Sequence, residues 1–170
     1  MTGVRSASVL ALAALCVGGG APRAAPPAPA PVRIAVFAFE LIDATPSQVL
    51  LGKSTSEAAT LVKVSQAARE QLAQSGRYRV IDASQATEPR LGDCDGCEAA
   101  LALKLGADQS LLGVVKRVTQ TDYYMLIQIR DAHTGRLLDQ QGANFAGSED
   151  GWASGVRMLI KHQILAPPPE

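Results

Sequence analysis

Short apolar runs alternate with amphipathic segments along most of this chain. Residues 32–39 (VRIAVFAF) form a nearly continuous apolar run, which predicts a strand buried on both faces of a sheet. Residues 56–74 carry apolar side chains at helical spacing, with Ser56 as the expected N-cap and Glu57 in the first turn. This second segment predicts a long amphipathic helix.

The rest of the pattern predicts two more helices and four more strands. The expected strands are residues 77–81, 107–118, 122–130 and 136–145, with a hairpin turn at 131–135, and the expected helices are residues 98–105 and 148–162. The predicted order is β-α-β-α-β-β-β-α. A parallel beginning followed by an antiparallel meander indicates an α/β (α+β) fold, with helices packed on a mixed sheet.

The first residues read as an export signal. Residues 1–5 carry one positive charge, and residues 6–17 are apolar and uncharged. That run is shorter than the roughly 20 apolar residues of a membrane-spanning helix, but it fits a secretory signal. We therefore predict a signal peptide at 1–24 and a periplasmic or secreted protein.

An Ala/Pro segment separates this signal from the folded part. Residues 25–31 contain only Ala, Pro and small apolar side chains, which is typical of an extended linker that does not pack. The pattern then predicts a single α/β domain at 32–165 and a disordered, proline-rich tail at 166–170. The domain is expected to contain no transmembrane segment.

Cys16 raises the alternative of a lipid anchor. A lipobox needs a small residue directly before the cysteine, and Leu15 occupies that place. We expect Cys16 to be removed with the signal rather than lipidated.

Charge and aromatic content exclude some partners. The chain has 16 basic and 16 acidic residues, and removing the signal shifts the balance slightly toward acidic. Such a balance offers no basic surface for nucleic acid. Three Phe, three Tyr and one Trp also leave little for a base-stacking platform.

Cys94 and Cys97 form a C-x-x-C at the start of a predicted helix. In an oxidising compartment such a pair favours a structural disulfide. The helix N-terminus could instead stabilise a thiolate, which would make the pair redox-active, although Asp93, Asp95 and Glu98 oppose this. Metal binding is the third interpretation.

No cofactor or metal set is complete in the sequence. A zinc site would need two more ligands beside the cysteines, and only His133 and His162 are present, without ligand spacing. Haem attachment would need a histidine where Glu98 stands. We expect no cofactor and no metal.

Two further pairs of residues are candidates for binding. Glu40 and Asp43 follow the first strand, where open α/β sheets place ligand-binding loops, and could hold a cation or a small ligand. A solvated strand end explains them equally well. Tyr123 and Trp152 are candidate interface aromatics, although Trp152 also suits the edge of the core.

Three segments together resemble a known family. Residues 34–43 (IAVFAFELID), 94–108 (CDGCEAALALKLGAD) and 150–157 (DGWASGVR) are similar to an uncharacterised family of exported proteobacterial proteins, catalogued as domain of unknown function 2380 or 3280. The family usually has Phe-Asp-Phe in the first motif, whereas Ala38 stands here, so no role of that carboxylate carries over.

The element order also resembles the N-terminal domain of TolB and the lipoprotein activators of penicillin-binding proteins. By analogy this likeness implies a binding or scaffolding module rather than an enzyme. We therefore expect a non-catalytic periplasmic accessory module that docks on a protein partner. The alternatives are a thiol-redox protein using Cys94 and Cys97, and a small-ligand or cation carrier using Glu40 and Asp43.

Overall fold

A computed structural model describes residues 30–42, 55–86, 90–119, 122–146 and 150–166. Its elements follow one another as β1 (Val32–Val36), β2 (Glu40–Ile42), α2 (Thr55–Gln74), β3 (Tyr78–Asp82), a 3-10 turn η1 (Leu91–Asp93), α3 (Cys97–Lys104), β4 (Gln109–Arg117), β5 (Asp122–Asp131), β6 (Leu137–Ala146), α4 (Asp150–Leu159) and a π-helical end η2 (Ile160–Ile164). The predicted fold class is confirmed, with one additional strand.

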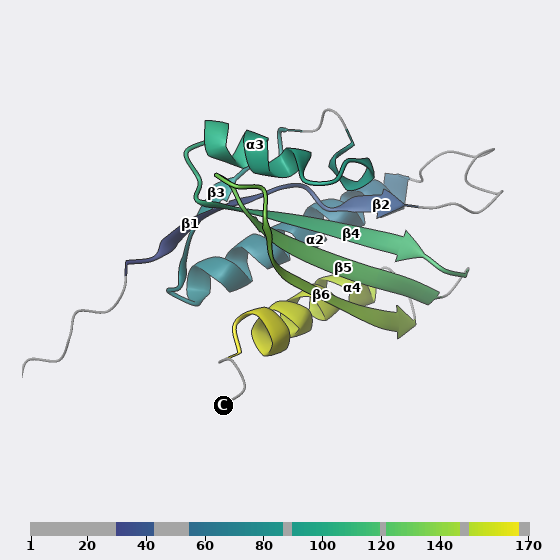
Figure 1. Ribbon diagram of the computed structural model, residues 1–170. Helices are drawn as coiled ribbons and strands as arrows, with labels where there is room; N and C mark the ends of the chain where they lie inside the picture. Colours follow the sequence, from purple (N-terminus) through teal and green to yellow (C-terminus); the bar gives the residue numbers. More distant parts are fainter. Residues whose placement is uncertain (1–29, 43–54, 87–89, 120–121, 147–149, 167–170) are drawn as a thin grey trace, which may run out of the picture.

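One mixed sheet organises the domain (Figure 1). Its strands lie in the order β3-β1-β4-β5-β6, and β2 pairs with β4 beyond the end of β1. The pairs β1–β3, β1–β4 and β2–β4 are parallel, whereas β4–β5 and β5–β6 are antiparallel. The hairpin between β5 and β6 turns at Gly135, whose φ of 71° suits a residue without a side chain.

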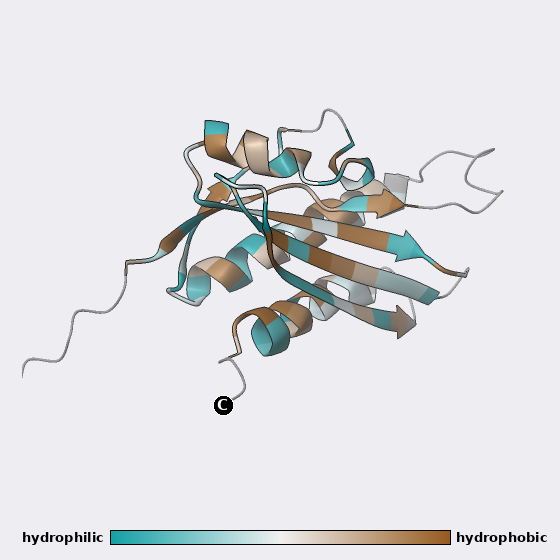
Figure 2. Cartoon of the chain, viewed as in Figure 1, coloured by the Kyte–Doolittle hydropathy of each residue, from teal (hydrophilic) through white to brown (hydrophobic). Residues whose placement is uncertain are grey.

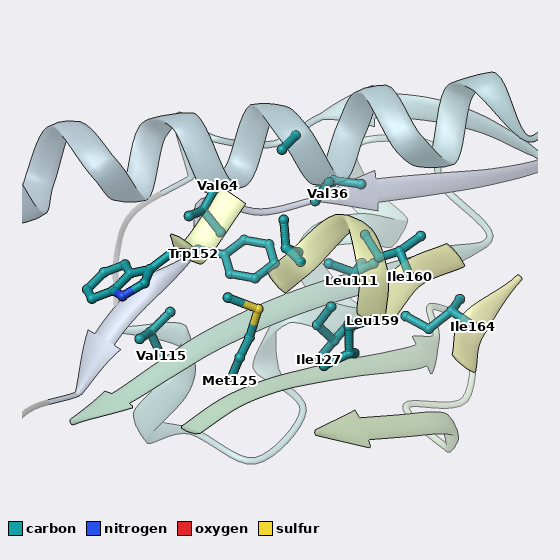
Figure 3. Packing of buried hydrophobic residues seen from close by; sticks show 14 of the residues in the cluster. Val36, Val64, Leu111, Val115, Met125, Ile127, Trp152, Leu159, Ile160 and Ile164 are labelled. Atoms are coloured by element: carbon teal, nitrogen blue, oxygen red, sulfur yellow. The ribbon is translucent and has the colours of Figure 1, made fainter. Parts of the chain in front are cut away.

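Helices cover both faces of the sheet. Helices α2 and α4 pack on one face, and α3 lies on the other (Figure 1). The larger core lies between the sheet and the α2–α4 layer, and one cluster of buried residues there includes Val64 of α2 and Leu111, Met125 and Ile127 of the strands (Figure 3). Strand β4 is mostly hydrophobic along its length, as a strand in the middle of the sheet must be (Figure 2).

The predicted strand at 32–39 is interrupted, which the sequence analysis did not foresee. Strand β1 ends at Val36, opposite Leu111, and β2 resumes at Glu40, opposite Val114. The chain therefore advances by one residue more than β4 does, as at a β-bulge. The apolar run gave no indication of this break, because the segments on both sides of it are buried.

The ends of the predicted segments differ in detail. The last helix changes from α to π geometry at Ile160, within the range predicted to be helical. The predicted signal peptide, most of the linker, Asp43 and Ser148 lie outside the described residues. None of the helices described is long and apolar enough to cross a membrane.

Candidate functional site

Strand β6 forms one edge of the sheet. It is ten residues long and, in the described part of the chain, pairs only with β5. Asp139 is its single charged residue, and its sequence contains no proline or lysine. Natural edge strands usually carry such residues, because unpaired backbone groups invite another strand to add. An unprotected edge of this length is therefore a candidate docking surface.

An apolar groove lies beside this edge, between β5, β6 and α4. Its volume is about 250 Å³. It is lined by Met125, Ala143, Asn144, Phe145, Gly155, Met158, Leu159, His162 and Gln163. The groove is open partly because Gly155 has no side chain, and no heavy atom lies within 4 Å of where its Cβ would be. Met158 is 59% exposed and leaves an apolar side chain accessible at the groove.

Three aromatic rings cluster at one end of the groove, and one of them, that of Phe145, lines it. Phe145 faces α4 because it pairs with Tyr123, and its ring centroid lies 5.8 Å from that of Tyr123 and 6.4 Å from that of Trp152. The Tyr123 and Trp152 rings meet edge to face at 4.8 Å. These contacts hold the start of α4 against the sheet.

Tyr123 and Trp152 therefore do not form an exposed interface, contrary to the expectation. Trp152 is fully buried and Tyr123 is 6% exposed. Tyr123 faces inward because it shares a face of β5 with Met125 and Ile127, and the rings fill the core at the start of α4. Only Phe145 of this aromatic group lines the groove.

Glu40 caps a turn rather than lying free in a loop. It begins β2, and its carboxylate oxygens accept hydrogen bonds from the N–H groups of Leu91 (2.9 Å) and Gly92 (3.0 Å). Both oxygens are thus engaged with the backbone of η1. Asp43, the expected partner of Glu40, lies outside the described residues.

Cys94 and Cys97 lie side by side and are joined as a disulfide, with their Cα atoms 5.9 Å apart. Cys97 begins α3, and Gly96 before it has a φ of 88°, which closes the short loop. Both cysteines are half-buried. The disulfide ties η1 to the start of α3.

Arg130 of β5 holds this disulfide loop against the sheet. Its guanidinium pairs with Asp95, between the two cysteines, and its Nε lies 3.1 Å from Oε1 of Glu98. Its Nη1 also donates to the carbonyl oxygen of Gly135 in the β5–β6 turn, at 3.2 Å. One side chain therefore links the loop, α3 and the hairpin.

Glu98 is an unusual residue in this cluster. It is 1% exposed, and its Oε2 accepts no hydrogen bond from a described residue. Burial raises the pKa of Glu98, while the charge of Arg130 opposes the rise. From the sequence Glu98 was expected only to oppose a thiolate at the cysteine pair and to stand where haem attachment needs a histidine, and its burial was not predicted.

The histidines do not join the cysteines. His133 lies in the hairpin turn, with its Nε2 3.9 Å from Asp108, and His162 lines the groove. Within the described ranges, no group of three or more His, Cys, Asp or Glu residues could hold a metal ion.

Sequence reasoning found the cysteines but missed the groove. Two signals for it were present in the sequence. The amphipathic pattern of α4 leaves Met158 outside the core, and β6 has few charges. Both become informative only once the sheet order shows that β6 lies at an edge.

Comparisons with known proteins agree with this fold. Family DUF3280, described as "Protein of unknown function (DUF2380)", matches residues 32–164. No curated protein matches the chain. The resemblance predicted from the three motifs is confirmed.

Several solved structures are similar to the chain. The PelC dodecamer from Paraburkholderia phytofirmans is 15% identical, with 79% of this chain and 86% of that chain covered and a TM-score of 0.50. Lipoprotein GNA1162 from Neisseria meningitidis is 18% identical, with 79% and 98% covered and a TM-score of 0.50. The LpoB C-terminal domain from Salmonella enterica is 14% identical, with 69% and 84% covered and a TM-score of 0.48. At these identities the likeness to PelC and to GNA1162 shows the fold alone.

Proposed function

The chain belongs to the family described as "Protein of unknown function (DUF2380)", and from that premise we propose that it is a non-catalytic accessory module of the cell envelope that docks on a protein partner. The predicted export signal at 1–24 supports the compartment. One solved structure of similar fold is a lipoprotein and another assembles as a dodecamer, which supports a role in binding.

One observation carries the proposal: the unprotected edge of β6 lies beside an apolar groove. A backbone edge and an apolar hollow are complementary means of binding protein. The polar clusters described instead bind the chain to itself, as Glu40 does with η1 and Arg130 with the disulfide loop.

Site-specific photocrosslinking in cells tests the docking surface. A photoreactive residue at Met158, in the groove, is expected to form an adduct with one envelope protein. The same residue at Lys104, exposed on α3 across the sheet, is the matched control. Absence of any adduct specific to position 158, or recovery of the protein in the cytoplasmic fraction, would contradict the proposal.

A thiol-redox function is the second candidate. The half-buried Cys94–Cys97 disulfide has a buried carboxyl, that of Glu98, in the next residue along α3. In such a reaction a partner dithiol would be oxidised to a disulfide, while Cys94 and Cys97 take up two electrons and two protons. The reduction potential and the thiol pKa values decide between the roles. A very negative potential with unshifted thiol pKa values leaves a structural disulfide.

A further inference from the structure

We propose that the edge of β6 and the groove bind a single occupant, an extended segment of the protein partner. This segment adds to the sheet next to β6, points apolar side chains into the groove at every second residue, and carries acidic residues that face α4. The inference rests on the proposed docking function and specifies its chemistry.

The backbone of β6 supplies the first half of the site. All ten of its residues lie in a strand whose other edge is used by β5. A strand presents hydrogen-bonding groups to both sides, so the outer row is available for a further strand. Asp139, the one charged residue of β6, lies near the start of the strand, four residues before the groove residue Ala143.

The groove supplies the second half of the site, and its residues on β6 are spaced as alternate side chains of a strand are. Ala143 and Phe145 are two residues apart and face α4, because they pair with the buried Met125 and Tyr123. Side chains of an added strand alternate in the same way, so every second one lies over the groove. Gly155 and Met158 form the opposite wall, and the missing side chain at Gly155 leaves the room.

Positive charge on α4 and η2 selects the residues that flank the apolar ones in the occupant. Arg157 of α4 and Lys161 of η2 are both exposed, next to the groove residues Met158 and His162. Among the described residues no carboxylate pairs with either; Arg157 Nη1 donates only to the carbonyl of Ala153, at 3.4 Å. Acidic residues in the occupant would complement them.

A second copy of β6 fits this site poorly. Side chains of β6 on the α4 face include Asp139 and Gln141, because these pair with Ile129 and Ile127 of the core face. A symmetric pairing would place a carboxyl group against the apolar groove, which costs desolvation energy. The occupant is therefore a different protein segment with apolar residues at these positions.

The test uses the mature chain and a phage-displayed library of random peptides. Selected peptides are expected to alternate apolar and polar residues and to contain acidic residues. Gly155→Leu fills the groove and is expected to weaken binding at least about tenfold, the effect of losing one buried apolar side chain. Gly151→Leu is the matched control, since it is on the same helix, also meets no atom within 4 Å and does not line the groove.

Two further measurements keep the test independent of the folding of Gly155→Leu. A bound peptide should slow hydrogen exchange of β6 amides but not of β3 amides at the other edge. The double variant Arg157→Glu/Lys161→Glu should bind the acidic peptides more weakly than the wild type does, while its fold stays intact.

Several results would overturn the inference. The first two are selected peptides that do not alternate apolar and polar residues, and an equal loss of peptide affinity in Gly151→Leu and Gly155→Leu. The others are unchanged hydrogen exchange of the β6 amides with peptide bound, and a stable homodimer in sedimentation that does not bind peptide. If Met158 crosslinks to an envelope protein while the library yields no such peptide, the docking function stands and the added strand is wrong.

Discussion

The ring of Phe39 lies directly over the backbone of Gly113, so closely that a Cβ built on Gly113 would be 2.1 Å from Cε1 of the ring. Phe39 occupies the break between β1 and β2, and its backbone N–H donates to Oγ of Ser65 on α2 at 2.8 Å. The extra residue in this segment is thus accommodated by a glycine on the neighbouring strand.

Gly113→Ala is expected to destabilise the domain by about 1–3 kcal/mol, because the methyl group overlaps the ring of a packed, buried residue. Chemical denaturation measures the change. In a Phe39→Leu background, Gly113→Ala should lower the free energy of unfolding by less than it does in the wild type. Strictly additive losses of stability would contradict the contact between the ring and Gly113. Gly151→Ala, with open space around its Cβ, should be neutral or slightly stabilising.

The pair of Arg130 and Glu98 predicts that removing the cation alone costs more stability than removing both charges. Arg130→Met leaves the Glu98 carboxylate buried without its cation and is expected to cost about 3 kcal/mol at neutral pH. The double variant Arg130→Met/Glu98→Gln should recover part of this loss. Thermal unfolding of the two variants and the wild type checks it, and a double variant less stable than Arg130→Met would refute the explanation.

Glu98 also predicts a pH dependence. Because burial raises its pKa above the usual 4.5, the folded state holds the proton more tightly than the unfolded chain. Stability from this group is full below that usual value and falls as pH rises through the folded pKa. Glu98→Gln should flatten this part of the stability curve. An unchanged curve would show that Glu98 ionises in the folded state as in water.

Asp108 predicts the opposite behaviour in acid. Two hydrogen bonds from the Arg33 side chain, at 2.7 and 2.9 Å, lower the pKa of Asp108 to about 2. The stability it contributes is present above the usual value of 3.8 and is lost as pH falls toward 2. Asp108→Asn should remove this acid-side loss, and an unchanged acid unfolding curve would contradict the linkage.

Most of the fold follows from the sequence pattern. The helix at 56–74 and the strands at 122–130 and 136–145 were predicted within two residues of the observed bounds, because their periodicity is unbroken and their turns contain glycine. The break after Val36 was missed, since a run that is apolar on both faces carries no alternation to show a change of register. Gly113, a glycine inside the predicted strand at 107–118, was the remaining sign in the sequence of a close approach by another group.

The candidate site was less predictable for a related reason. The disulfide pair is local in sequence and was recognised, whereas Arg130 reaches it from a strand more than thirty residues away. The groove likewise depends on which strand ends the sheet and on where α4 crosses it. Local periodicity indicates which face of a strand is buried, but not which neighbour covers it.

Glu40 predicts a structural role that can be separated from cation binding. Glu40→Leu leaves the Leu91 and Gly92 N–H groups without an acceptor and should cost about 1–3 kcal/mol, with Glu40→Gln retaining part of the stability. Adding calcium or magnesium should not raise the melting temperature of the wild type. A cation-dependent rise that Glu40→Gln abolishes would revive the carrier hypothesis.

Trp152 is the single tryptophan of the chain and reports on the contact between α4 and the sheet. Because its ring is fully buried against Tyr123, its emission should be blue-shifted and resist quenching by acrylamide. Phe145→Ala removes the ring that separates this core from the groove and should open Trp152 to quencher, at a cost of about 3 kcal/mol or less, since Phe145 is only half-buried. Met158→Ala lies in the same groove but is not part of the aromatic cluster, and it should leave the quenching unchanged. Equal quenching in the two variants would show that the aromatic cluster does not seal the core at this end of α4.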